Sequence, residues 1–189
     1  EKPIPKDNEV LVKVRASSIN DWDWGLLRGK PFMNRVAFGL FRPRTRILGA
    51  DIAGEVEAVG SKILQFQPGD KVFGDISGCG FGGFAEYVCV PEKAITHKPL
   101  SLTCEEAAAV PQGGILALQG LGYKGHIQPG QKVLIIGAGG GAGTFAIQIA
   151  KSLGAEVTGV DNTIKQDIMR STGADHVIDY TREDFTKNG

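Results

Sequence analysis

The feature that most constrains this chain is a run of small residues between an apolar segment and a segment with helical spacing. The run has the sequence GAGGGAG from Gly137 to Gly143, and the apolar residues 133–136 precede it. Apolar residues then recur at helical spacing from Phe145 to Leu153. A strand-to-helix turn without bulky side chains lets its backbone approach a phosphate, which the positive end of the helix dipole also attracts. The run therefore predicts a pyrophosphate-binding turn.

The turn can be read in two registers, and the residues alone leave both open: GxGxxA from Gly137, or AxGxxG from Ala138. Asp161 lies 18 residues beyond Gly143, where a carboxylate would accept hydrogen bonds from an adenosine ribose and repel a 2′-phosphate. This slightly favours NAD(H) over NADP(H). Asp161 could instead be an exposed turn residue, and Lys165 could reach a phosphate. The candidate cofactor-binding residues are Gly137, Ala138, Gly139, Gly140, Gly141, Ala142, Gly143, Asp161, Asn162, Lys165 and Tyr180.

The segments around the turn alternate between strand and helix. Residues 133–136 form a continuous apolar run, which predicts a parallel strand buried on both faces. Residues 157–160 and 176–180 predict two further strands, with a helix over residues 165–172 between them. Together they predict a partial Rossmann βαβαβ unit. Only about half of such a fold is present, so we expect the chain to be part of a longer protein.

The first part of the chain has a different pattern. Residues 9–15 alternate between Val and other side chains, which predicts a strand. Residues 52–59, 71–73 and 84–90 are short runs rich in β-branched or aromatic residues, separated by Gly and Pro. This part therefore predicts a small, mostly antiparallel β domain.

A helical connection joins the two parts. Thr103 and Glu106 have the spacing of a capping box, which predicts a helix start. Pro111 and the Gly113-Gly114 pair are expected to break that helix before a second helical piece. We therefore predict a β domain over residues 1–125 and a nucleotide-binding domain over residues 126–189.

Composition excludes some classes of partner. Lys plus Arg and Asp plus Glu both number 21, so the balanced charge predicts no nucleic acid and no membrane partner. The three cysteines are far apart and form no CxxC pair, which disfavours a disulfide framework or a structural zinc lobe. A reducing, cytoplasmic location fits these features best.

Several short motifs resemble one protein family when taken in order. They are residues 16–20 (ASSIN) with Asp23 and Arg28-Gly29, residues 48–54 (LGADIAG), 66–72 (FQPGDKV), 83–87 (GFAEY) and 107–111 (AAAVP), followed by the glycine turn. With them, the chain resembles the zinc-free, quinone oxidoreductase-like branch of the medium-chain dehydrogenase/reductase superfamily. The resemblance implies a GroES-like domain, a Rossmann domain and a homodimer in the full-length protein. It also implies a small-molecule substrate, with NAD(P)H-dependent hydride transfer to a quinone or an α,β-unsaturated carbonyl.

The resemblance also bears on metal binding. Zinc enzymes of the superfamily have a Cys where this chain has Ser18-Ile19-Asn20, and Gly-His-Glu where it has Gly49-Ala50-Asp51. Without a thiolate or imidazole there, these positions cannot form a tetrahedral zinc site, and we expect no metal. A hydrogen-bond donor must then stabilise the negative charge that develops as hydride arrives. The family places Asn20 near the nicotinamide, so Asn20 is the candidate donor, and Asp23 is the second candidate, more suited to ordering the loop.

Other interpretations stay open. Asn20 could be a turn residue bonded only to its own backbone. Leu116 and Gly25 stand where the family often has Thr and Tyr, so a non-catalytic cofactor-binding protein is an alternative. An alcohol dehydrogenase-like activity is a further alternative. Trp22 and Trp24 could line an apolar cleft or pack as core, and residues 30–46 are expected to form a solvated loop or lid.

Overall fold

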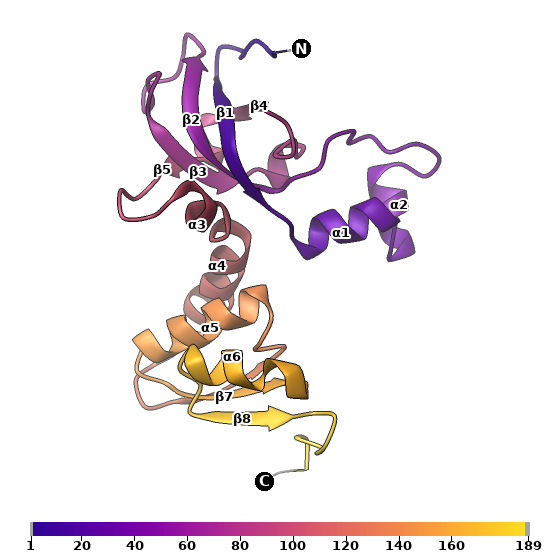
Figure 1. The fold of residues 1–189 in the computed structure, drawn as a ribbon, viewed down its shortest axis with the longest axis vertical. Helices are drawn as coiled ribbons and strands as arrows, with labels where there is room; N and C mark the ends of the chain where they lie inside the picture. The colour runs from indigo at the N-terminus through magenta and orange to yellow at the C-terminus, as the bar shows by residue number, and fades with distance from the viewer. Residues whose placement is uncertain (1, 188–189) are drawn as a thin grey trace. The chain divides into compact units, whose positions relative to one another are not determined.

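A computed structural model describes residues 2–187, and the chain divides into two units, Glu1–Gln112 and Gly113–Gly189. The first unit contains a five-stranded antiparallel sheet and the second a three-stranded parallel sheet (Figure 1). No helix within residues 2–187 combines the length and apolar character needed to cross a membrane.

The sheet of the first unit has the strand order β4-β1-β2-β3-β5. Its strands are β1 (Glu9–Ser18), β2 (Asp51–Val59), β3 (Lys71–Asp75), β4 (Tyr87–Pro91) and β5 (Thr96–His97). Alternate side chains of these strands form the core, as the period-two pattern predicts. The core residues are Val10, Val12, Ile52, Val56, Phe66, Val72, Ile76, Val88, Val90 and Ile95. The strand predicted to begin at residue 84 begins at Tyr87, because Phe84 lies in a turn where its amide donates to the Leu48 carbonyl at 2.9 Å.

The pairing of β1 with β2 positions the candidate site. Their antiparallel register places Ser18, the last residue of β1, opposite Asp51, the first residue of β2. Asn20 follows two residues after this pair and caps α1 (Asp21–Arg28). Residues far apart in the sequence therefore meet at one end of the sheet.

The segment predicted as a solvated loop or lid contains a helix. After α1, α2 (Phe32–Phe38) forms within residues 30–46, and both helices project from the strands of the first unit (Figure 1). Phe38 holds α2 in place through edge-on contacts with Trp22 and Phe81, with ring centroids 6.0 and 6.1 Å away. Local apolar contacts therefore order part of a segment that sequence patterning did not predict to be helical.

The other helical segments of the first unit are short. They are η1 (Ser77–Cys79), η2 (Glu92–Ala94) and α3 (Cys104–Ala108). The predicted capping box begins α3, because the Thr103 side chain accepts from the Glu106 amide at 3.1 Å and the Glu106 carboxylate accepts from the Thr103 amide at 2.8 Å. Ala107 and Ala108 of α3 pack against Ala53 of β2.

The predicted break before a second helical piece occurs, since α3 ends at Ala108 and α4 (Pro111–Leu118) begins at Pro111. The part given to Gly113-Gly114 is wrong, because both glycines lie inside α4. A Cβ at Gly113 would lie 3.0 Å from the Phe145 ring, so the glycine allows close packing rather than ending the helix. α4 continues into a π-helical segment, η3 (Gln119–Lys124). Ala117 and Leu121 pack in the core of the second unit, which is why the two units divide before the residue 125 boundary that we predicted.

The second unit follows the predicted βαβαβ order. It consists of β6 (Lys132–Ile136), α5 (Gly141–Ser152), β7 (Glu156–Asp161), η4 (Thr163–Lys165), α6 (Gln166–Ser171) and β8 (His176–Asp179). The parallel strands have the order β6-β7-β8, and α5 and α6 lie on one side of them in Figure 1. Ile147, Val157 and Met169 are fully buried where the helices pack on the sheet.

One prediction about this sheet is wrong. Residues 133–136 were expected to be buried on both faces, yet Leu134 and Ile136 are 52% and 68% exposed. Within residues 2–187, β6 pairs with β7 alone, and its neighbours there cover one face of it. The apolar side chains at alternate positions therefore remain exposed.

Candidate functional site

The side chain of Asn20 is held at the end of the first sheet. Its Nδ2 atom donates to the Ser18 hydroxyl and to Asp51 Oδ2, each at 3.1 Å. Both amide hydrogens are thereby used within the unit. Donation to a substrate oxygen would require the amide to exchange one partner. The neutral Ser18 hydroxyl is the easier one to release, since hydrogen bonds to a carboxylate are the stronger.

Asp23 joins two backbone segments beside Asn20. Its Oδ2 accepts from the Asn20 amide at 3.0 Å, and its Oδ1 accepts from the Gly49 amide at 2.8 Å. The residue is only 2% exposed, so these two bonds satisfy a buried carboxylate. Gly49 has a φ of +101°, and a Cβ there would lie 2.5 Å from the Phe84 amide nitrogen. Asp23 therefore orders the backbone around Asn20, and its bonds are to main-chain amides.

Asp51 is the functional candidate that sequence reasoning missed. It is completely buried, and its Oδ2 accepts from Asn20 Nδ2 at 3.1 Å and from the Ser18 hydroxyl and the Gln112 amide, each at 3.2 Å. Its Oδ1 has no hydrogen-bond partner among the described residues. A signal was present in the sequence, because an acidic residue precedes the apolar residues Ile52 and Ala53 at the start of a predicted strand.

The surroundings of Asp51 favour its neutral form. Burial raises the pKa of the carboxyl to about 6, and the nearby charge of Asp75 adds to this, although hydrogen bonds from Gln112, Asn20 and Ser18 act in the opposite direction. The pKa therefore lies close enough to neutrality for the group to change its charge under ordinary conditions. Because Asn20 donates to this same carboxyl, ionisation of Asp51 would strengthen the hydrogen bond that holds the Asn20 amide.

The glycine turn of the second unit is shaped by close packing. Gly137 has a φ of +74°, and the amides of Gly137 and Ala138 both donate to the Val160 carbonyl, at 2.8 and 3.2 Å. A Cβ at Gly143 would lie 2.2 Å from the Gly137 carbonyl oxygen, which only glycine avoids. Gly143 thus has the role of the glycine that packs the helix on the strand. This decides between the two registers in favour of AxGxxG from Ala138.

The outer side of the turn is open. A Cβ built at Gly137 or Gly141 would meet no atom within 4 Å. Gly141 is the first residue of α5, whose N-terminal amides and dipole favour an anion. The residues present therefore fit a phosphate-bearing ligand on this side of the turn.

The predicted partners of the turn do come together. Asp161 Oδ2 accepts from the Gly139 amide at 3.0 Å, and its Oδ1 accepts from the Asn162 amide at 2.8 Å. The Lys165 ammonium donates to the Gly139 carbonyl at 2.9 Å. Asp161 thus holds the turn through the Gly139 amide and is only 9% exposed, so it is not an exposed turn residue.

The remaining candidates lie beside this group. Asn162 caps η4 by accepting from the Ile164 amide at 3.1 Å. Tyr180 follows β8, and its amide donates to the Asp161 carbonyl at 3.2 Å, while its side chain is exposed. Tyr180, Asn162 and Lys165 therefore surround the end of β7 at Asp161.

Within residues 2–187, no group of three His, Cys, Asp or Glu side chains is arranged to hold a metal ion. His97, His126 and His176 are all exposed. Ala50, at the position where related zinc enzymes have a His, is fully buried and has no ligand atom.

Two family matches define the class of protein. Residues 6–100 match the alcohol dehydrogenase GroES-like domain, and residues 141–188 match the zinc-binding dehydrogenase family. The chain thus belongs to the medium-chain dehydrogenase/reductase superfamily, within its quinone oxidoreductase-like branch. The predicted fold class, a GroES-like β domain followed by a partial Rossmann unit, is confirmed.

Curated relatives and solved structures agree with this assignment. The chain is 38% identical to the chloroplast envelope quinone oxidoreductase homolog of Arabidopsis thaliana, covering 94% of this chain and 54% of that protein. It is 36% identical to 2-methylene-furan-3-one reductase of Solanum lycopersicum, covering 97% and 47%.

Among solved structures, the quinone oxidoreductase of Coxiella burnetii has a TM-score of 0.89 at 33% identity, covering 98% of this chain and 58% of that one. The Escherichia coli quinone oxidoreductase complexed with NADPH has a TM-score of 0.81 at 29% identity, covering 95% and 52%. The chain thus spans about half the length of the curated relatives it matches.

Proposed function

We propose that the protein transfers hydride from NAD(P)H to a quinone or an α,β-unsaturated carbonyl without zinc. The observation that carries this proposal is the glycine turn, where Gly143 packs against Gly137 and the outer side stays open. The names of the relatives support the substrate class, since they include quinone oxidoreductases and a 2-methylene-furan-3-one reductase.

The chain's own residues would hold the cofactor at two places. The backbone of the turn and the first amides of α5 would bind the pyrophosphate. Asn162, Lys165 and Tyr180 would bind the adenosine ribose end, because they surround Asp161 at the end of β7. When bound, the reduced nicotinamide supplies the hydride.

The preference for NAD(H) remains a prediction. It assumed a carboxylate facing the ribose, whereas both oxygens of Asp161 accept bonds from backbone amides in the structure. The Lys165 ammonium lies next to the same turn and offsets part of the repulsion between Asp161 and a 2′-phosphate. The ratio of kcat/KM for NADH and NADPH tests the preference, and a ratio in favour of NADPH contradicts it.

Asn20 and Asp51 have separate roles in this proposal. Asn20 donates from Nδ2 to the carbonyl oxygen that gains negative charge, by releasing the Ser18 hydroxyl. Asp51 is a positioning residue that holds the second hydrogen of the same amide. A conjugated acceptor suits this site, because the developing charge spreads over several atoms and one neutral donor is enough.

Turnover by the full-length protein tests the function. NADH and NADPH oxidation is measured against a panel of quinones and α,β-unsaturated carbonyls, with metal content measured on the same preparation. We expect turnover without stoichiometric metal, and Asn20→Ala should lower kcat by about 100-fold, as for loss of an oxyanion donor. Cofactor binding without oxidation by any acceptor would favour the non-catalytic alternative. Stoichiometric zinc would favour the alcohol dehydrogenase-like alternative.

The variant Asp51→Asn separates positioning from chemistry. In the wild-type protein, kcat should change near pH 6 as Asp51 ionises. The amide of Asp51→Asn keeps an oxygen for Asn20 but cannot ionise, so this change should disappear while cofactor affinity stays unchanged. A profile that keeps its step near pH 6 removes Asp51 from the proposal.

Light scattering on the full-length protein tests the proposed homodimer, and fractionation of its source cells tests the predicted cytoplasmic location.

A further inference from the structure

One segment of the first unit has a net positive charge, although the whole chain has a formal net charge of zero. Residues 25–50 contain six basic residues and no acidic residue, although the whole chain has 21 of each kind. The basic residues are Arg28, Lys30, Arg35, Arg42, Arg44 and Arg46. The rest of the chain therefore has a net negative charge, and this segment is a separate cationic surface.

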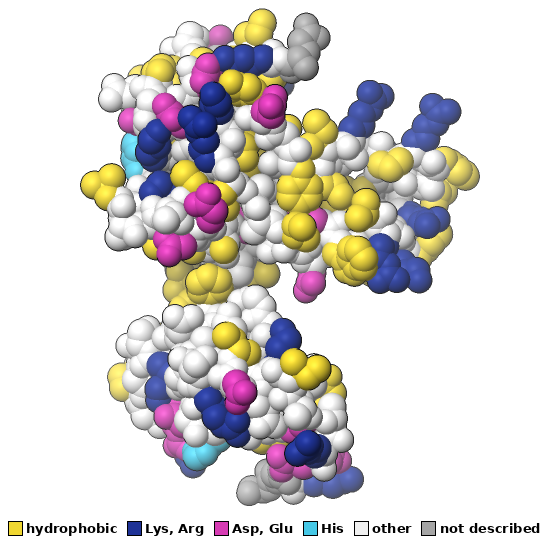
Figure 2. Space-filling model, in the orientation of Figure 1, with side chains coloured by type: hydrophobic (Ala, Val, Ile, Leu, Met, Phe, Trp, Pro, Cys, Tyr) yellow, Lys and Arg dark blue, Asp and Glu magenta, His cyan; other side chains and the backbone are white. Residues whose placement is uncertain are grey.

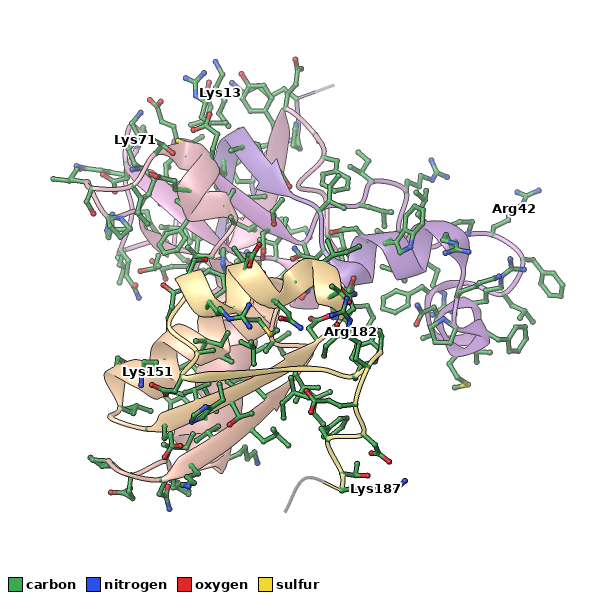
Figure 3. All side chains as sticks on the ribbon, turned by 60° about the horizontal axis from the view of Figure 1, so that its bottom comes forward. Lys13, Arg42, Lys71, Lys151, Arg182 and Lys187 are labelled. Carbon is green, nitrogen blue, oxygen red and sulfur yellow. The ribbon has the colours of Figure 1, made fainter. Side chains whose placement is uncertain are left out.

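Most of these cations are not neutralised within the unit. The side chains of Lys30, Arg42, Arg44 and Arg46 form no ion pair or hydrogen bond with any residue in the described part of the chain. Figure 3 shows Arg42 at the outer end of the projection formed by α1, α2 and the following loop. The charges are therefore available to an external anion.

The same segment exposes large apolar side chains. α2 has no buried residue, and its outward side chains Phe32 and Met33 are 65% and 66% exposed, while Phe41 in the following loop is 93% exposed. Leu27, Val36 and Leu40 extend this surface. Figure 2 shows dark blue and yellow side chains together over the projection. We call the six basic residues and these six apolar residues the α2 surface.

A cavity opens within the α2 surface. Its volume is about 340 Å³, and Arg28, Arg35 and Arg46 line it together with Phe38 and Leu40. Arg35 donates to the Gly29 carbonyl at 3.2 Å, and Arg28 lies 5.0 Å from the centre of the Trp24 ring, so two of the guanidinium groups are held in place. A cavity lined by both cationic and apolar side chains suits a phosphate headgroup with the start of its acyl chains.

We propose that the α2 surface binds the surface of a membrane that contains anionic phospholipids. Basic residues attract the lipid phosphates, and exposed aromatic and aliphatic side chains enter the boundary between headgroups and acyl chains. A second copy of this chain fits the surface less well, because symmetric contact would place the arginines of the two copies together. This proposal is independent of the proposed hydride transfer.

Nucleic acid is the other anion to consider. It accounts for the basic residues, and Phe32 or Phe41 could stack on bases. It gives no reason for the aliphatic side chains of Leu27, Met33 and Val36 to be exposed beside them. The combination of charge with aliphatic surface therefore favours the membrane.

Co-sedimentation with vesicles tests the proposal on the purified protein. Vesicles of phosphatidylcholine with about 30% phosphatidylglycerol should bind it, and vesicles of phosphatidylcholine alone should not. Each cation near such a surface contributes about a fivefold factor to binding, so Arg42→Gln with Arg44→Gln should weaken binding about 25-fold. Phe32→Ser with Phe41→Ser should also weaken it, by at least about tenfold.

Two matched variants elsewhere in the chain serve as controls. Lys93→Gln with Lys124→Gln removes two exposed charges, and Leu64→Ser with Leu100→Ser removes two side chains that are 92% and 98% exposed. Neither should change vesicle binding. Circular dichroism of all four variants shows whether each is folded.

Several results would overturn the proposal. Equal binding to neutral vesicles, no binding at all, or equal losses in the control variants would each do so. Competition by a DNA duplex together with normal binding by the Phe32/Phe41 variant would indicate a nucleic acid surface. A dimer that the Phe32/Phe41 variant dissociates, without vesicle binding, would indicate self-association.

Discussion

The buried carboxyl of Asp51 gives the most quantitative prediction. Burial, opposed by hydrogen bonds from Gln112, Asn20 and Ser18, raises the pKa of this carboxyl from 3.8 to about 6. The native state thus binds the Asp51 proton more tightly than the unfolded state does. Asp51→Asn removes this titration and keeps an oxygen that can accept the same three bonds. Its amide nitrogen replaces Oδ1, the atom that has no hydrogen-bond partner in the part of the chain that the structure describes.

The sign and size of the effect follow from proton linkage. Below about pH 4 the carboxyl is neutral in both states and has no pH-dependent effect. As the pH rises from about 4 to about 6, the free energy of unfolding of the wild-type protein falls, because the unfolded state releases the Asp51 proton first. Above pH 6 this decrease is complete. A pKa shift of about two units corresponds to about 3 kcal/mol, of which about 2 kcal/mol falls between pH 4.5 and 8.5. Asp51→Asn should therefore gain about 2 kcal/mol relative to wild type over that range.

Urea unfolding followed by tryptophan fluorescence measures this difference. The two tryptophans of the chain, Trp22 and Trp24, lie in the same unit as Asp51. Glu55→Gln on the same strand is the control. A hydrogen bond from Lys71 lowers the pKa of Glu55, so the stability that Glu55 provides is present at high pH and is lost on acidification. Its variant should show a trend of opposite sign.

The reasoning is refuted if Asp51→Asn differs from wild type by the same amount at every pH. A difference that grows on acidification also refutes it. A constant difference would mean that the three hydrogen bonds to Oδ2 cancel the effect of burial on the pKa of Asp51. A difference that grows on acidification would mean that the hydrogen bonds outweigh burial and lower this pKa.

Three further predictions follow from the packing. Gly143→Ala should lower the free energy of unfolding by about 1–3 kcal/mol, because its Cβ would lie 2.2 Å from the Gly137 oxygen. Gly141→Ala should change it by no more than about 0.5 kcal/mol. Hydrogen exchange of α5 amides measures both changes, and equal effects would contradict the AxGxxG register. Asp23→Ala should lower the free energy of unfolding by about 2–4 kcal/mol, because it leaves the Asn20 and Gly49 amides without an acceptor. A urea midpoint equal to that of wild type would count against the proposal that Asp23 orders the backbone. Burial raises the pKa of the Cys89 thiol, so at about pH 8 iodoacetamide should modify exposed Cys79 faster than Cys89, and mass spectrometry after peptide digestion shows whether the order is reversed.

Local patterns in the sequence were enough to predict the kinds of element and their order. Alternation predicted β1, and the capping box predicted the start of α3 at Cys104. These predictions succeed because the periods of strands and helices are properties of neighbouring residues. Gly113 and Gly114 show where such reasoning fails, since small residues serve close helix packing as readily as they break a helix.

The site depended more on tertiary structure. The sequence identified the glycine turn and brought Asn20, Asp23, Asp161 and Lys165 into consideration, through motifs whose residues lie close together in the chain. It could not choose the register of the turn, because both readings contain equally small residues. The 2.2 Å approach of a Gly143 Cβ to the Gly137 oxygen decides it, and that distance depends on how α5 packs on β6.

Asp51 shows most clearly what the sequence determined and what the tertiary structure decided. The sequence by itself determined that an acidic residue stands at the start of β2, directly after Ala50, where related zinc enzymes have a His. Only the tertiary structure decided that β1 and β2 pair Ser18 with Asp51, so that Asn20 and Gln112 reach its carboxyl. The burial of Asp51 and the resulting pKa of its carboxyl depend on groups from distant parts of the chain. A local sequence pattern cannot predict which groups those are.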